Sequence, residues 1–128
     1  MASSFGIDLS LATSYDYTTT YSGFFDSPLY VVGSINNLRS FTELEIVLAK
    51  DLATGEGIQI KYRVNLTDSF TAVKTPNGGT LSFDFATLGA VISHHVIADI
   101  PACEMLQIRV ELEGTTTTTP QFKSLTLR

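Results

Sequence analysis

The stretch from 104 to 128 constrains the fold more than any other part of this sequence. Its first half alternates strictly between apolar and polar residues. The apolar positions are Leu106, Ile108, Val110 and Leu112. Because successive side chains of a strand point to opposite faces, this alternation predicts a β-strand with one buried face and one solvent face. Gly114 ends the strand, and Pro120, which has no backbone N–H, precedes a second predicted strand over 121–128.

The same period of two recurs along the rest of the chain. Further strands are predicted at 5–11, 29–32, 41–50, 58–66, 70–74, 81–85 and 94–97. The segment 41–50 also contains helix-favouring residues, but its alternation is the better pattern, so a strand paired with 58–66 is predicted. In that partner, Leu66 is expected to face inward. Asn77-Gly78 indicates a tight turn, and 86–93 can hold a single helical turn.

Together these segments predict an all-β fold, an antiparallel β-sandwich of jelly-roll-like form with about eight to ten short strands. The sequence has no linker and no internal repeat, so residues 1–128 are expected to form one domain. Residues 13–21 are open to two interpretations, a strand or part of an extended N-terminal arm within 1–25. The single cysteine, Cys103, allows no intrachain disulfide, and a chain of this length does not need one to build a core.

Charge and hydropathy exclude two classes of partner. The formal net charge is -5, and the eight Lys and Arg residues are scattered, so we expect no binding to a nucleic-acid backbone. No apolar run approaches the ~20 residues that a membrane helix requires, so no membrane partner is expected. The first four residues lack the basic and apolar regions of a signal peptide, so we expect a protein that is made and kept in a cytosol or that leaves it by a route that needs no signal.

The residue types that carry most enzyme chemistry are few and poorly placed for it. His94 and His95 are the only histidines, and on a strand they point to opposite faces, so they do not bind one ion together. Cys103 lacks the surroundings of a catalytic cysteine. Glu111 and Glu113 share a strand face, as glutamates on a solvated face ordinarily do. We therefore expect no enzymatic activity, no catalytic residues, no metal site and no cofactor.

Five aromatic residues near the N-terminus are the strongest candidates for a contact surface. They are Tyr15, Tyr17, Tyr21, Phe24 and Phe25. Tyrosine is enriched at protein interfaces because its ring is large and amphipathic and loses little entropy on binding. Three interpretations stay open for these residues: the inward face of a strand, contact with another protein, or stacking on sugars. The five threonines at 115–119 are expected to form a loop, and Thr116 and Thr117 in this loop are a second candidate for protein contact.

The closing stretch also combines several features in a fixed order. They are Gln107, Arg109 and Leu112 in the first strand, the threonines at 115–119, Pro120, and Leu125 with Leu127 in the last strand. This combination resembles the closing strands of small β-sandwich modules in structural proteins of tailed bacteriophages. Residues 41–50 and 58–63 resemble the paired strands of these modules, and 21–29 (YSGFFDSPL) resembles their opening segment.

The resemblance implies a non-enzymatic virion structural protein, either a capsid cement (decoration) protein or a tail accessory protein. In one respect the sequence departs from these modules: it starts at Met1, which favours a free-standing accessory protein over a module of a longer tail protein. Its expected partner is a major capsid protein or a tail or baseplate protein, present in repeated copies. A homodimer or homotrimer is expected, because closed symmetry is common among oligomers. The expected location is the virion, after assembly in the host cytoplasm. The alternative function is a carbohydrate-binding or host-adhesion module, which the tyrosines favour and the absence of Trp disfavours.

Overall fold

Ten strands and one short helix make up the described part of the chain, which covers residues 5–8, 22–88, 92–115 and 118–128 of a computed structural model. The strands are β1 (Phe5–Asp8), β2 (Ser22–Asp26), β3 (Tyr30–Val31), β4 (Arg39–Leu48), β5 (Gly57–Arg63), β6 (Thr71–Ala72), β7 (Phe83–Asp84), β8 (Ser93–Cys103), β9 (Met105–Glu113) and β10 (Phe122–Leu127). The helix α1 (Phe85–Leu88) is the single helical turn predicted after the segment 81–85.

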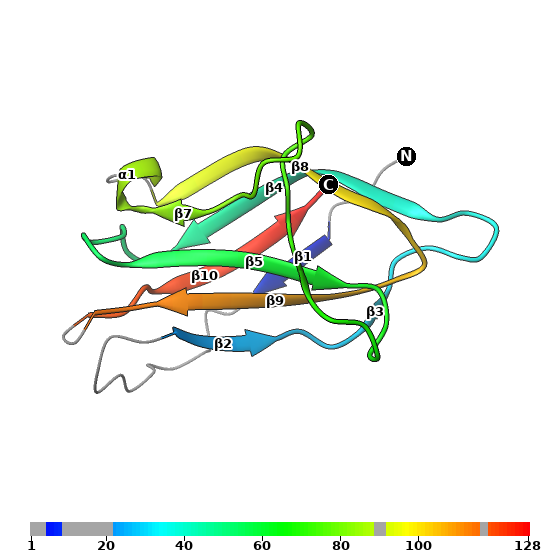
Figure 1. Cartoon of the computed structure of the whole chain (residues 1–128), viewed down its shortest axis with the longest axis horizontal. Helices are drawn as coiled ribbons and strands as arrows, with labels where there is room; N and C mark the ends of the chain where they lie inside the picture. Colours follow the sequence, from blue (N-terminus) through cyan, green and yellow to red (C-terminus); the bar gives the residue numbers. More distant parts are fainter. Residues whose placement is uncertain (1–4, 9–21, 89–91, 116–117) are drawn as a thin grey trace.

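The strands form two antiparallel sheets that pack face to face (Figure 1). The first sheet has the order β1-β10-β4-β8, and the second has the order β2-β9-β5-β6, with β3 added to β9 and β7 added to β5. The pairing is nested: β1 pairs with β10, β2 with β9, β4 with β8, and β5 with β6. A long antiparallel hairpin folded over on itself in this way is a jelly roll, so the predicted fold class is confirmed.

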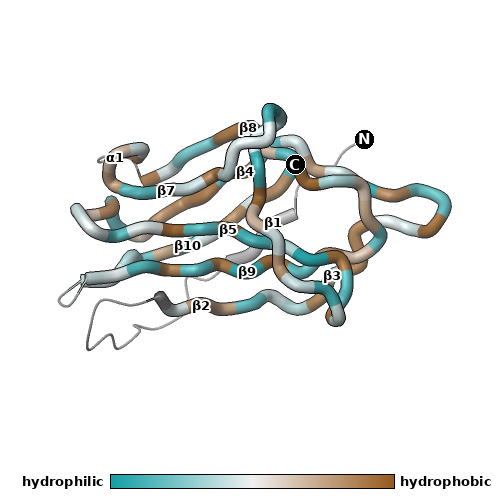
Figure 2. The backbone as a smooth tube through the Cα atoms, viewed as in Figure 1, coloured by the Kyte–Doolittle hydropathy of each residue, from teal (hydrophilic) through white to brown (hydrophobic). Residues whose placement is uncertain are grey.

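The core lies between the sheets and is built from alternate residues of the long strands. Figure 2 shows the alternation as brown and teal segments along β9. The inward residues, each at most 2% exposed, are Leu106, Ile108, Val110 and Leu112 of β9, Leu44, Ile46 and Leu48 of β4, and Leu125 and Leu127 of β10. The inward face that alternation predicted for residues 106–112, which belong to β9, is therefore confirmed.

The predicted pairing of 41–50 with 58–66 is wrong. Both segments contain strands, but β4 pairs with β8 and β10 in the first sheet, whereas β5 pairs with β9, β6 and β7 in the second. The connection between them crosses from one sheet to the other and buries Leu52 on the way. Alternation reports which face of a strand is apolar, but it does not report which strand lies alongside.

Several strand ends also differ from their predicted positions. The strand predicted at 94–97 is longer and runs to Cys103 as β8. β5 ends at Arg63, and Leu66 is 59% exposed rather than inward. The side chain of Asn65 ends the strand, because its Oδ1 accepts hydrogen bonds from the backbone N–H groups of Thr67 and Asp68, both at 2.9 Å. The predicted strand 81–85 shrinks to β7, because Phe85 begins the helical turn.

We expect Ile108→Ala to lower the free energy of unfolding by about 2–5 kcal/mol, because it leaves a cavity where both sheets meet. Leu66→Ala removes an exposed apolar side chain and serves as the control, with an expected change within about 0.5 kcal/mol. Urea unfolding followed by circular dichroism measures both. Equal changes in the two variants would contradict the core assignment.

Candidate functional site

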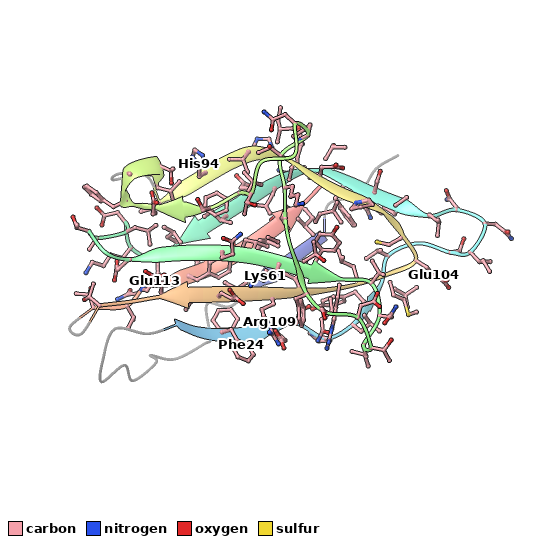
Figure 3. The ribbon with its side chains drawn as sticks, in the orientation of Figure 1. Phe24, Lys61, His94, Glu104, Arg109 and Glu113 are labelled. Carbon is pink, nitrogen blue, oxygen red and sulfur yellow. The ribbon has the colours of Figure 1, made fainter. Side chains whose placement is uncertain are left out.

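The outer face of the second sheet carries a cluster of stacked aromatic and arginine side chains. Arg109 lies at its centre, with its guanidinium carbon 4.0 Å from the centroid of the Phe24 ring and 4.1 Å from that of Phe70. Asp26 holds the guanidinium by two hydrogen bonds, from Nε to Oδ1 at 2.7 Å and from Nη2 to Oδ2 at 3.0 Å. We call Phe24, Asp26, Arg63, Phe70 and Arg109 the aromatic–arginine cluster. Figure 3 shows Phe24 and Arg109 beside each other on β2 and β9.

Strand register brings these residues together from distant parts of the sequence. β2 pairs with β9 so that Asp26 lies opposite Arg109. Phe24 is two residues before Asp26 and therefore points to the same face of the sheet. Phe70 arrives from the loop after β5, and the guanidinium carbon of Arg63 lies 4.4 Å from its ring centroid. Arg63 also donates from Nη1 to the backbone oxygen of Asp68 at 3.2 Å, which ties the loop to the strand.

A buried glutamine on β9, Gln107, holds part of the cluster in position. Gln107 is only 8% exposed, yet both ends of its amide are satisfied. Its Oε1 accepts a hydrogen bond from Nε of Arg63 at 2.6 Å, and its Nε2 donates to the backbone oxygen of Ser27 at 2.8 Å. Because a buried amide that lost a partner would be costly, these bonds fix the positions of Arg63 and of the end of β2.

The charges on this face are largely paired with each other. The hydrogen bonds to Asp26 raise the pKa of Arg109 above its already high ordinary value, so the guanidinium stays charged. Lys61 forms an ion pair with Glu111 at 3.0 Å. The result is a pre-arranged, nearly neutral surface whose most exposed part is the ring of Phe24, at 55%. Aromatic and arginine side chains of this kind are enriched in the centres of protein interfaces.

A groove of about 450 Å³ lies next to the cluster, where the ends of β5 and β9 meet β7 and α1. Its lining includes the exposed ring of Phe85, the carboxylates of Asp84, Glu111 and Glu113, and the amide of Gln59. Gly57 lies in register with Glu113 on one side and with Asp84 on the other. Glu111 thus lines the groove and also forms the ion pair with Lys61 beside the aromatic–arginine cluster.

The aromatic residues predicted from the sequence divide into two groups. Phe24 belongs to the aromatic–arginine cluster, whereas Phe25 points inward, where its ring centroid lies 6.3 Å from that of Phe122. Adjacent residues of one strand face opposite sides, so these two do not form one surface. The other predicted contact residues, Tyr15, Tyr17, Tyr21, Thr116 and Thr117, lie outside the described residues.

The sequence reasoning missed the roles of Arg109, Arg63, Phe70 and Phe85. One signal was available for Arg109, because it stands at an outward position of the clearest strand. Its partner Asp26 is separated from it by 83 residues, and only the register of β2 against β9 connects them. Phe70 and Phe85 carried no such signal, because each lies just outside a strand of the structure, where alternation does not report which way a side chain points.

The histidines lie as expected on opposite faces of β8. His94 is half-buried with its ring edge against Phe83, at a centroid distance of 6.2 Å, and His95 has its Nε2 3.5 Å from Oε2 of Glu43 on the solvent face. Within 5–8, 22–88, 92–115 and 118–128, no three His, Cys, Asp or Glu side chains are grouped to hold a metal ion. In the same ranges, no helix has the length and apolar character needed to span a bilayer.

Cys103 gives a pH-dependent prediction. Burial raises the pKa of its thiol above the ordinary value of 9.0. As the pH rises past that value, the thiol ionises in the unfolded chain before it ionises in the folded protein, and this ionisation favours unfolding. The contribution of the protonated Cys103 thiol to stability is therefore fully present below about pH 9 and is lost above it. We expect urea unfolding to show a smaller alkaline loss of stability in Cys103→Ala than in the wild type. Parallel pH profiles of the two proteins would contradict this.

A double-mutant cycle tests the stacking in the aromatic–arginine cluster. We expect Phe24→Ala and Arg109→Ala to show a coupling free energy of about 0.5–1 kcal/mol, as for other exposed cation–π pairs. The matched control pairs Phe24→Ala with Arg128→Ala, because Arg128 contacts Glu45 on the other sheet. A coupling no larger than that of the control would show that the two side chains do not interact in solution.

No protein-family model, curated protein or solved structure matches this chain at a significant level. Its own residues therefore carry the functional argument. On the outer face of the second sheet, these residues provide a pre-arranged aromatic–arginine surface and an adjoining polar groove.

Proposed function

We propose that this chain is a non-enzymatic structural accessory protein of a tailed-phage particle. It would act as a capsid cement (decoration) or tail-associated protein that binds repeated copies of a shell or tail protein through the aromatic–arginine cluster. The observation that carries the proposal is the ring of Phe24, exposed on the edge strand β2 of the second sheet and stacked on an arginine that is already held in place. The jelly roll is compatible with this role but does not establish it, because one fold serves many functions.

Pre-arrangement is what makes the aromatic–arginine cluster suited to contact. Asp26 holds one edge of the Arg109 guanidinium through two hydrogen bonds, from Nε and Nη2, so little side-chain freedom remains to be lost on binding. Phe24 then adds apolar area that a partner buries. Asp26 neutralises Arg109, whereas Arg63, among the described residues, bonds only to the neutral oxygens of Gln107 and the Asp68 backbone. The cluster therefore carries one net positive charge, and its contacts are expected to weaken modestly with salt.

Because the partner protein is present in many copies, a small contact surface is sufficient to attach the chain to a particle. The cluster alone presents few large side chains, and one such contact is weak once the entropy of association is counted. A homodimer or homotrimer, the oligomers expected for this chain, places several copies of the surface against a repeated shell or tail protein. Each further contact then forms at high effective concentration, which multiplies weak affinities.

The test is a binding experiment on gradient-purified particles of the phage that encodes the chain. We expect the chain in those particles at a fixed ratio to a shell or tail protein. After removal, wild-type protein and Ile97→Ala rebind, whereas Phe24→Ala binds at least about tenfold more weakly. Ile97 is the matched control, because it is 65% exposed but lies on β8 of the first sheet.

Two results would overturn the proposal. The first is absence of the chain from purified particles. The second is equal rebinding by Phe24→Ala and Ile97→Ala, when urea unfolding shows both variants to be folded.

A further inference from the structure

The groove beside α1 offers a second kind of binding surface, independent of the proposed particle contact. Its volume of about 450 Å³ falls in the range of roughly 300–1,000 Å³ that is typical of small-ligand sites. It is open on one side, along the outer face of the second sheet. Figure 3 shows Glu113 at the end of the sandwich that carries α1, opposite the end that carries Glu104.

An exposed phenylalanine is held rigidly at the edge of this groove. Phe85 is 47% exposed although it is the first residue of α1. Asp84 and Thr87 cap the turn reciprocally: the backbone N–H of Thr87 donates to Oδ1 of Asp84, and the backbone N–H of Asp84 donates to Oγ1 of Thr87, both at 2.9 Å. β7 fastens the same segment to β5. The ring therefore stands as a fixed apolar wall.

The opposite wall consists mainly of hydrogen-bond acceptors. Gln59 donates its Nε2 to the backbone oxygen of Leu81 at 2.6 Å, which leaves its Oε1 as an acceptor. Glu111 uses Oε2 for Lys61, and Oε1 remains. The side chain of Glu113 is exposed, and its carboxylate forms no hydrogen bond or ion pair within the described residues. A ligand that satisfies this wall must supply several donors while it lays an apolar face on Phe85.

Gly57 keeps the groove open between these walls. It points to the outer face, because its neighbour Ile58 points into the core. A Cβ built at this position meets only the backbone oxygen of Phe83 at 3.5 Å and Cβ of Glu113 at 4.0 Å, which are ordinary contacts. A larger side chain at 57 would therefore fill the groove without straining the strand.

We propose that this groove binds an uncharged oligosaccharide. A sugar ring presents hydroxyl donors along its edge and C–H groups on its face. The hydroxyls match the oxygens of Gln59, Glu111 and Glu113, and the C–H groups match the electron-rich face of an aromatic ring. Saccharides with carboxylate or sulfate groups are disfavoured, because four acidic residues already line the groove: Glu56, Asp84, Glu111 and Glu113.

A lysine-rich peptide is the competing ligand, since carboxylates also attract cations. Salt separates the two, because exposed ion pairs are screened strongly between about 0.1 M and about 1 M salt, whereas hydrogen bonding and stacking to a neutral sugar are not. An oligosaccharide that occupies the groove is expected to keep its affinity within about twofold over that range.

The experiment screens neutral oligosaccharides built of glucose, galactose, mannose and N-acetylhexosamine units, beside a uronate oligosaccharide and an oligolysine. Calorimetry then measures the affinity of each ligand found. We expect at least one neutral oligosaccharide to bind. Phe85→Ala should weaken it about tenfold by loss of stacking, and Glu113→Gln should weaken it about tenfold by loss of a charged acceptor. Gly57→Leu should abolish binding by filling the groove.

Matched controls keep the test decisive. Glu104→Gln makes the same chemical change at the far end of the sandwich, and Ile97→Ala removes an exposed apolar side chain from the other sheet. Both should bind as the wild type does. The proposal is overturned if no neutral oligosaccharide binds, if oligolysine is the better ligand at high salt, or if folded Gly57→Leu still binds. Particle binding by Phe24→Ala is a separate readout, so failure of one proposal is distinguishable from failure of the other.

Discussion

The register of β9 between β2 and β5 is the constraint on which both faces of the second sheet depend. β9 pairs with β2 on one side and β5 on the other over most of its length. Inward, it contributes Leu106, Ile108, Val110 and Leu112 to the core. Outward, it supplies Gln107, Arg109, Glu111 and Glu113. Because the side-chain period of a strand is two, a slip of one residue would exchange these sets and lose the core and the outer surface together.

The outward-facing side chains of β9 belong to two different kinds of surface along the same strand. Near Gln107 and Arg109, the neighbouring strands bring aromatic rings and an aspartate, and Asp26 neutralises Arg109. Toward Glu113, the neighbour on β5 is Gly57, with the short β7 beyond it, so the carboxylates are left with space in front of them. A stacked, nearly neutral surface suits a protein partner, and an open polar groove suits a small hydroxylated ligand. The two proposals follow from this difference in neighbours.

Local pattern was a reliable guide wherever a strand is long and half-buried. The alternation at 106–112 identified the buried face of β9, and alternation outweighed helix propensity correctly at 41–50, which contains β4. The predictions failed where a strand stops. Leu66 continues the apolar period of β5 but follows the turn at Asn65, and Phe85 continues that of β7 but begins α1. In both places a side-chain hydrogen bond to the backbone outweighs the apolar period.

The sequence alone determined that this chain is a β-sandwich, because a period of two in side-chain polarity needs no knowledge of distant contacts. It also determined which face of β9 is buried. Strand partners were decided only by the tertiary structure, since many antiparallel pairings bury the same apolar faces and the nested arrangement is chosen by the fold as a whole. For the same reason, the contact of Arg109 with Phe24, Asp26 and Phe70, and the groove between Phe85 and Glu113, exist only once β2, β5 and β7 lie alongside one another in register.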